Sequence, residues 1–453
     1  MNHDDVFPAE RVGGQPTFPS LQERSHISPS SASESNPRRA LVAGAIGNAV
    51  EWYDFAVYGV LASIFAGQFF PSDNPTTQLL AAFALFGVGF VMRPLRAVVF
   101  GYYGDRIGRR AALSAAVIMM STATLMIGVI PTYAQVGLLA PLLLCVARLL
   151  QGFSAGGEWG GSTSFMVEYA PAHRRGLYGS WQQCSVAIGF LTGSIVAAGL
   201  TRVLGEETMS SWGWRMPFVV GGIIGVVGLY LRIKLEDTPA YLAAKDDDLP
   251  VKNPVRETLM NYRKESVIAF FFPALWNVTY YTLLTFMPTY IAKTLGYSTF
   301  QALGASVLSL TVFAILIPVL GSLSDRIGRK PLMITSAAGF TALTLPVFIL
   351  MANGGYAAVL TGVVIFAVLL SAFSGPGPTA LAEVFPTEVR YTALSIGYNF
   401  SSVVFGGTAP FLATYLIDKT GSKVAPAAVV IVGCAITLIV VLKLRETAHE
   451  KLA

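Results

Sequence analysis

Long apolar stretches, separated by short polar segments, recur along the chain from Ala40 almost to its last residue. Each stretch approaches the roughly 20 residues that an α-helix needs to cross about 30 Å of hydrocarbon. The pattern therefore predicts an all-α integral membrane protein with twelve transmembrane helices. We place them near residues 40–69, 79–103, 111–130, 138–166, 177–201, 214–235, 266–291, 300–323, 331–351, 356–384, 391–417 and 424–444.

Polar segments mark the divisions between these stretches. Residues 1–39 are rich in Ser, Pro, Glu and Arg without an apolar block, which predicts a disordered tail rather than a secretory signal. The charged segment 236–265 is predicted to link two six-helix halves, 40–235 and 266–444. Residues 445–453 then form a short tail. The chain is thus predicted to consist of two membrane halves joined by one polar linker.

Composition supports lipid as the solvent of this chain. It is 53% hydrophobic and only 13% charged, whereas soluble proteins carry about a quarter charged residues. Cys145, Cys184 and Cys434 all lie in apolar runs, where free cysteine behaves as a small hydrophobe. We find no phosphate-binding loop, nucleophile elbow or zinc-ligand spacing, so we expect no enzyme activity, no metal site and no cofactor.

The distribution of Lys and Arg predicts the orientation, because basic residues concentrate on the cytoplasmic side of a membrane. With both termini in the cytoplasm, most of the 31 basic residues fall in cytoplasmic segments. The loops on the other side hold only Arg202, Arg215, Lys293, Lys419 and Lys423. The net charge of +5 therefore reflects topology, and nucleic acid is not an expected partner.

The two halves repeat one another at the ends of helices. GYYGDRIGRR (101–110) follows the second stretch and GSLSDRIGRK (321–330) follows the eighth. The pattern Glu-x-x-Pro-x-x-x-Arg recurs from Glu168 and from Glu383, and Leu235–Thr238 is echoed by Leu444–Thr447. Three echoes in one order indicate parallel six-helix halves around a central cleft, the architecture that alternating access requires.

Ionisable residues inside predicted membrane helices are energetically costly and are therefore candidate functional groups. Glu51 and Asp54 lie one turn apart in the first stretch, and Glu158 lies in the fourth. We consider these three acids the candidate proton carriers. Arg93, Arg148 and Gln151 are the candidate ligands for a substrate carboxylate. The alternative is a buried ion pair between a span-1 acid and one of the arginines that only fixes packing.

Aromatic and amide side chains on two stretches complete the candidate site. Aromatic rings can hold an ammonium group, although an aromatic stripe that only packs helices explains the pattern equally well. Gly152, Gly156 and Gly160 form a ridge that permits close helix packing. The further candidate substrate ligands are Trp52, Tyr58, Trp276, Asn277, Tyr280 and Tyr281.

These motifs resemble the metabolite:proton symporter family of the major facilitator superfamily. The resemblance rests on the two Asp-Arg-x-Gly-Arg motifs, on 47–55, on the Arg93-Pro94 pair and on 148–158. It implies transport driven by the proton-motive force, with a gate at the cytoplasmic face. The implied gate residues are Asp105, Arg106, Arg109, Asp325, Arg326, Glu168 and Glu383. The alternative is that the basic residues of these motifs only obey the positive-inside rule.

Members of the family carry citrate and dicarboxylates, shikimate, or proline and glycine betaine. The segments 277–288 and 385–394 look like the proline/betaine branch, whose osmosensing members add a coiled-coil tail that this chain does not show. Arg96 stands where relatives usually have glycine, and a second cation beside Arg93 favours a di- or tricarboxylate. The alternatives are that Arg96 extends to the cytoplasmic face or pairs with an acid of the fourth stretch.

We therefore predict a secondary transporter that carries a small carboxylate-bearing metabolite with a proton. The alternative substrate is a proline- or betaine-type zwitterion, and a remote alternative function is a nutrient sensor. We expect a monomer in a bacterial-type inner membrane.

Overall fold

The computed structural model describes residues 37–107, 109–155, 158–233, 260–448 and 450, and the regular elements in this part of the chain are all helices. Ten helical stretches are long and apolar enough to cross a membrane. Two shorter apolar helices, Ala115–Val129 and Gly213–Gly228, complete the set. The predicted all-α membrane fold with twelve spans is confirmed.

Six of the spans precede residue 234 and form what we call the first half. The fourth span consists of α5 and α6, and the short helices α4 (Tyr133–Val136) and α8 (Glu206–Ser211) lie between spans. The spans are α1 (Pro37–Phe69), α2 (Pro75–Ile107), α3 (Arg109–Val129), α5 (Leu139–Ala155) with α6 (Glu158–Glu168), α7 (Arg175–Leu204) and α9 (Met216–Ile233).

The remaining six spans follow residue 260 and form the second half. Several of them change helix type along their length. The spans are α12 (Arg263–Phe271) with α13 (Ala274–Thr279), η4 (Tyr280–Phe286), α14 (Met287–Thr289) and η5 (Tyr290–Thr294); α15 (Thr299–Ile327); α16 (Arg329–Asn353); α17 (Gly355–Ser374) with α18 (Gly377–Ala382); α19 (Thr387–Ser401) with η6 (Ser402–Gly406) and α20 (Ala409–Thr420); and α21 (Pro426–Lys443).

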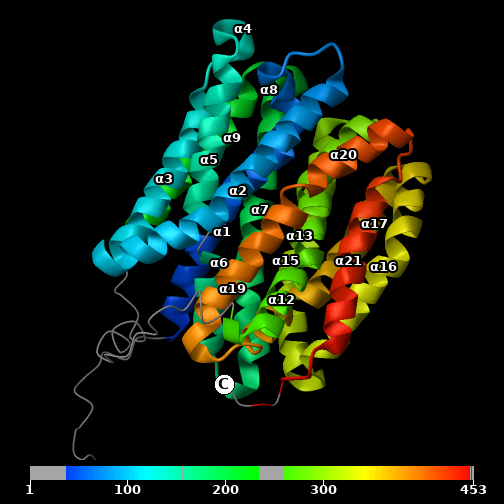
Figure 1. The fold of residues 1–453 in the computed structure, drawn as a ribbon. Coiled ribbons are helices and arrows are strands. Elements are labelled where there is room, and N and C mark those ends of the chain that lie inside the picture. The colour runs from blue at the N-terminus through cyan, green and yellow to red at the C-terminus, as the bar shows by residue number, and fades with distance from the viewer. Residues whose placement is uncertain (1–36, 108, 156–157, 234–259, 449, 451–453) are drawn as a thin grey trace, which may run out of the picture.

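The helices form one bundle in which the halves lie side by side (Figure 1). Helices α3, α5 and α9 lie on one flank, and α16, α17 and α21 lie on the opposite flank. Between them, α7 packs along α15 and α2 packs against α20, so each of these contacts joins the first half to the second. The centre of the bundle is therefore built from both halves.

Two kinds of irregularity interrupt the spans. The tenth span breaks between Ser374 and Gly377, within the Gly-Pro run 375–378 of the sequence. The seventh and eleventh spans contain π-helical turns at η4, η5 and η6, which the sequence pattern does not predict. Because π-turns are rare and occur mostly at functional sites, these turns direct attention to the side chains of η4, all of which are buried.

The predicted boundaries are correct to within a few residues. The first span begins at Pro37 rather than Ala40, and the seventh begins at Arg263 rather than at residue 266. Most of the predicted tail 1–39 and of the predicted linker 236–265 falls outside the described residues.

Candidate substrate and proton site between the two halves

Asp54 is a buried carboxylate in the middle of α1, with 1% of its surface exposed. It lies against α9, because a Cβ added to Gly221 would stand 2.8 Å from Asp54 Oδ1 and 3.0 Å from Thr124 Cγ2 of α3. Neither Asp54 oxygen has a hydrogen-bond partner among the described residues. The proposed alternative of an ion pair between Asp54 and Arg93 or Arg148 is therefore not seen.

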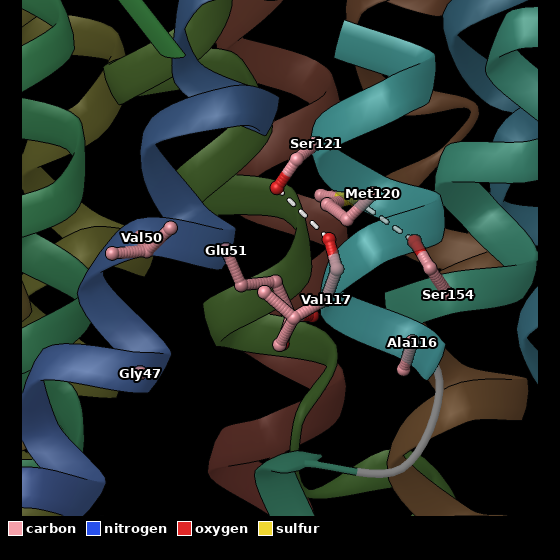
Figure 2. Close-up of a pocket in the computed structure, with 8 residues that line it drawn as sticks. All are labelled: Gly47, Val50, Glu51, Ala116, Val117, Met120, Ser121 and Ser154. Carbon is pink, nitrogen blue, oxygen red and sulfur yellow. Dashed lines mark hydrogen bonds between the residues drawn. The ribbon is translucent and has the colours of Figure 1, made fainter. Parts of the chain in front are cut away.

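Glu51 lies one turn earlier on α1 and is half-buried. It lines a small pocket between α1, α3 and α5, which Figure 2 shows in close-up. The Ser121 hydroxyl donates to the Val117 carbonyl (2.9 Å), and the Ser154 hydroxyl lies 3.0 Å from Met120 Sδ. The pocket is lined by Gly47, Val50, Glu51, Ala116, Val117, Met120, Ser121 and Ser154. Glu51 thus borders a small, mostly apolar pocket one turn of α1 away from Asp54.

Arg148 is fully buried on α5, and its guanidinium is largely committed to the protein. Its Nη1 donates to Gln151 Oε1 (2.8 Å) and its Nη2 donates to the Phe86 carbonyl (3.0 Å). The guanidinium carbon lies 4.2 Å from the centre of the Tyr58 ring. Gln151 Nε2 in turn donates to Thr124 Oγ1 (2.9 Å). Arg148 is therefore held in place by a network that leads toward Asp54.

Arg93 is also buried, but its guanidinium is much less committed. Its carbon lies over the rings of Phe90 (4.2 Å), Phe55 (4.5 Å) and Trp52 (5.8 Å). Its Nε and Nη2 atoms have no hydrogen-bond partner among the described residues. A buried cation with two such donors, surrounded by rings, can receive the carboxylate of a small molecule.

The predicted side chains of the seventh span face the same centre. The Tyr281 ring lies 4.9 Å from the Phe90 ring, so the second half meets the rings around Arg93. Trp276 Nε1 donates to Ser374 Oγ (2.9 Å), and Asn277 Nδ2 donates to Ser401 Oγ (3.1 Å). The Tyr280 hydroxyl donates to Gln183 Oε1 of α7. All four side chains are buried, and Tyr280 and Tyr281 each contact the first half.

A second group of rings joins the halves and was not predicted. Trp159 of α6 stacks on Tyr398 of α19, with ring centres 4.3 Å apart and planes 2° apart. Trp276 meets Trp159 edge-on at 5.8 Å. Trp159 follows the predicted Glu158 directly, but nothing in the sequence pairs it with Tyr398. The side chains of Glu158, Asp105, Arg106 and Arg109 lie outside the described residues.

Acidic and basic residues join the halves at the end of the bundle where the chain ends, which we call the C-terminal face (Figure 1). Asp325 accepts the backbone N–H groups of Gly176 (2.7 Å) and Leu177 (3.0 Å) at the start of α7, and Arg329 donates to it (2.7 Å). Arg390 of α19 pairs with Glu168 of α6 (2.7 Å). These contacts close the bundle at this face.

Glu383 lies in the same ionic cluster at the C-terminal face. It lies 3.6 Å from Arg329 and 3.8 Å from Arg175, and it accepts from the Thr447 hydroxyl. Burial raises the pKa of Glu383, and the neighbouring Arg329, Thr447 and Arg175 oppose that rise. Of the predicted gate residues, Arg326 is exposed, and it is Arg329 that joins this cluster.

The face at the other end of the bundle, which we call the opposite face, has a comparable contact. Glu206 follows the end of α7 and accepts the N–H groups of Thr299 (2.7 Å) and Phe300 (3.4 Å), the first residues of α15. Together with the burial of the central residues, the contacts at both faces describe a closed form, in which side chains fill the predicted cleft.

The fold closely matches that of solved transporters. The proton:xylose symporter XylE bound to 6-bromo-6-deoxy-D-glucose superposes with a TM-score of 0.74 at 18% identity, covering 92% of this chain and 97% of that one. A partially occluded inward-open form of XylE from E. coli gives 0.73 at 17% identity, covering 92% and 99%. With the twelve apolar spans, this likeness shows the fold of the major facilitator type.

The family of the chain follows from its sequence relatives. A profile described as "Sugar (and other) transporter" matches residues 40–257 and 249–453, and the chain belongs to this family. The proline/betaine transporter of Salmonella typhimurium is 38% identical over 431 residues, covering 92% of this chain and 85% of that protein. The glycine betaine/proline/ectoine/pipecolic acid transporter OusA of Dickeya dadantii is 38% identical over 430 residues, covering 92% and 84%. These relatives confirm the predicted resemblance to the proline/betaine branch.

Proposed function

We propose that this protein is a proton-coupled symporter of a small zwitterion that carries one carboxylate and one secondary or quaternary ammonium group. Arg93 is the observation that carries the proposal. Its two donors without a partner suit one carboxylate, and the rings of Trp52, Phe55 and Phe90 around it suit an adjacent ammonium group. The names of the relatives, which are proline and betaine transporters, point to the same chemistry.

A di- or tricarboxylate, the first of the two substrate classes considered from the sequence, is less well supported. A second carboxylate needs a second cation with free donors. Arg148 already donates from Nη1 and Nη2 within the protein, and among the described residues only its Nε has no partner, so fewer of its donors are free than those of Arg93. The other cation considered, Arg96, has its side chain outside the described residues. A substrate with a single carboxylate therefore fits the described site better.

Asp54 is our first candidate for the proton carrier. It is a buried carboxylate with no cation bonded to it among the described residues, an arrangement that favours protonation in a low-dielectric environment. Glu51 lies one turn away and lines the pocket between α1, α3 and α5, and it is the second candidate; Glu158 is the third. A proton on Asp54 and a substrate at Arg93 are then bound together in the first half.

Transport then proceeds by alternating opening of the two faces. The closed form has contacts between the halves at both, so each face has to release its own set: Asp325, Glu168 and Glu383 at the C-terminal face, and Glu206 at the opposite face. The distribution of Lys and Arg supports the C-terminal face as the cytoplasmic one, in a bacterial inner membrane. We propose a monomer as the working unit.

The substrate class is tested by counterflow in proteoliposomes preloaded with proline. Entry of labelled proline is measured in the presence of unlabelled glycine betaine, citrate, 2-oxoglutarate or shikimate. We expect inhibition by glycine betaine and none by citrate, 2-oxoglutarate or shikimate. If labelled citrate shows counterflow and proline does not, the zwitterion proposal is wrong and the carboxylate alternative replaces it.

A further inference from the structure

Two buried side chains, Gln151 and Thr124, connect Arg148 with the neighbourhood of Asp54. Arg148 Nη1 donates to Gln151 Oε1 (2.8 Å), and Gln151 Nε2 donates to Thr124 Oγ1 (2.9 Å). Gln151, Thr124 and Arg148 are each 0% exposed. Thr124 lies beside Asp54, since both flank Gly221 of α9. The sequence of donors therefore runs in one direction, from the arginine toward the carboxylate.

Thr124 differs from Thr201 and Thr344, two other buried threonines of the spans, in the use of its hydroxyl hydrogen. The hydroxyls of Thr201 and Thr344 donate to the carbonyl four residues earlier, at 2.8 and 2.6 Å. The Thr124 hydroxyl accepts from Gln151, and no acceptor for its own hydrogen is found among the described residues. Its oxygen is engaged while its hydrogen remains available.

Asp54 is the matching acceptor. Both Asp54 oxygens lack a hydrogen-bond partner among the described residues. The neighbouring side chain that can donate a hydrogen bond to them is that of Thr124. In the closed form the pair does not meet hydrogen-bond geometry, so a small rotation of either side chain is required. A buried, unpaired carboxylate gains considerably from such a bond.

The other groups packed against Asp54 do not compete for this role. The Tyr53 hydroxyl, on the same helix, already donates to the Pro217 carbonyl (2.8 Å). Helix α9 presents Gly221, which has no side chain, and α3 presents Thr124. The guanidinium of Arg148 reaches this region only through Gln151. Thr124 is thus the described link between the carboxylate and the arginine.

We propose that Thr124 and Gln151 are positioning residues that report the protonation state of Asp54 to Arg148. When Asp54 is ionised it accepts a hydrogen bond from the Thr124 hydroxyl, and all donors in this series of hydrogen bonds point toward Asp54. When Asp54 is protonated its own O–H donates to the second lone pair of Thr124 Oγ1, and the Thr124 hydroxyl no longer donates to a charged acceptor. The polarisation that strengthens the Gln151 contact is then lost, which weakens the hold on Arg148. The proton stays on Asp54 throughout, because neither Thr nor Gln titrates. This inference rests on the proposed proton symport.

The test compares Thr124→Val, which keeps the shape and removes the hydroxyl, with Thr124→Ser, which restores it. Each purified variant is reconstituted into liposomes, and proton-driven accumulation and counterflow of labelled proline are measured from pH 5 to pH 8. Coupling between sites typically changes affinity by about 5- to 150-fold. For Thr124→Val we expect the change in apparent KM between pH 5 and pH 8 to be about tenfold smaller than in the wild type. Proton-driven accumulation should fall far more than counterflow. Thr124→Ser should regain both.

Two further variants keep the test decisive. Thr344→Val removes a buried hydroxyl that donates to the Phe340 carbonyl, and it should transport like the wild type. Gln151→Met interrupts the same series of hydrogen bonds at Gln151. The double variant with Thr124→Val should therefore accumulate proline no less than the poorer single variant. If one single variant fails to fold, the other is read alone.

The outcomes separate this inference from the proposed function. A wild type that shows counterflow but no proton-driven accumulation would contradict symport itself. A wild type that accumulates proline, together with a Thr124→Val variant of unchanged pH profile, would leave symport standing and overturn the relay. Additive losses in the double variant would also overturn it, because they would show that the two side chains act separately.

Discussion

Two buried arginines of the first half differ in how many of their donors the protein uses. Arg148 donates to Gln151 and to the Phe86 carbonyl, whereas Arg93 has two nitrogens without partners among the described residues. An unpaired buried donor is costly, and a ligand that arrives with a carboxylate removes that cost. At the scale of single residues, Arg93 is therefore the substrate anchor that we propose, and Arg148 is held in place by the protein.

We predict that Arg93→Gln weakens substrate binding strongly. A lost hydrogen bond to a charged group corresponds to about 10- to 100-fold in affinity. Binding of labelled proline to the purified protein measures the change, with Arg202→Gln as the matched control. Arg202 lies outside the site, next to the Phe300 ring. Equal affinities for wild type and Arg93→Gln would show that Arg93 does not bind the substrate.

A second residue-scale prediction concerns Gly152, at the contact of α5 with α2. A methyl group at this position would overlap the Gly89 carbonyl. Overpacking of this kind costs about 1–3 kcal/mol, so Gly152→Ala should lower the melting temperature of the purified protein. Gly199→Ala is the control, because nothing lies within 4 Å of a methyl group there and alanine favours a helix. A Gly152→Ala variant as stable as the control would contradict the packing.

Sequence reasoning identified the charged residues and Gln151 of the candidate site, but not Thr124. Asp54, Arg93, Arg148 and Gln151 were predicted because such groups are rare in apolar spans. Thr124 gives no such signal, since a threonine in a membrane helix usually bonds to its own backbone. Its partner is Gln151, 27 residues away on another helix. Contacts of that kind depend on how helices pack, which hydropathy does not encode.

At the scale of elements, α7 and α15 run antiparallel, and an acidic residue closes each end of the pair. Asp325 at the end of α15 accepts the first N–H groups of α7, and Glu206 beyond the end of α7 accepts those of α15. Carboxylates are stabilised at helix N-termini, where unpaired N–H groups and the helix dipole favour negative charge. The same physical contact thus closes both faces of the bundle.

Asp325→Asn is predicted to favour opening at the C-terminal face. Contacts of a charge with a helix terminus are worth about 0.3–2 kcal/mol, or about 2- to 30-fold in the ratio of closed to open forms. Cys184 is a native reporter, because it is buried on α7 and its thiol lies 3.5 Å from the Ala314 carbonyl of α15. Its labelling by N-ethylmaleimide, with Cys145 and Cys434 replaced by alanine, should become faster.

Glu206→Gln provides the matched variant at the opposite face. It should favour opening there and therefore slow the labelling of Cys184, which lies nearer to the start of α7 than to its end. Faster labelling in both variants would mean that the two contacts only stabilise the fold. No change in either would show that neither acid controls opening.

The helices themselves were well predicted, and their irregularities only in part. Apolar stretches of sufficient length identify a span wherever it lies, and the Gly-Pro run near Pro376 announces a break. The π-turns at Tyr280–Phe286 and Ser402–Gly406 have no such marker. They lie where Gly406 packs against Tyr281, at a contact between the seventh and eleventh spans.

At the scale of the whole molecule, the two halves meet through small residues and rings as well as charges. Gly176 contacts Gly321 near the C-terminal face, and Gly87 contacts Gly407 between α2 and the eleventh span. Close approach without interlocking side chains allows one half to rock against the other. The echoes at 101–110 and 321–330 predicted this two-half organisation, whereas the closed form was not predictable from the sequence.

We propose that a proton gradient drives the accumulation of a zwitterion. Uptake of labelled proline into proteoliposomes at a fixed inward proton gradient tests this, with and without a protonophore, for the wild type and Asp54→Asn. We expect the wild type to accumulate proline above the external concentration, the protonophore to abolish this accumulation, and Asp54→Asn only to equilibrate proline. Accumulation that survives the protonophore, or full proton-driven accumulation in Asp54→Asn, would contradict this proposal.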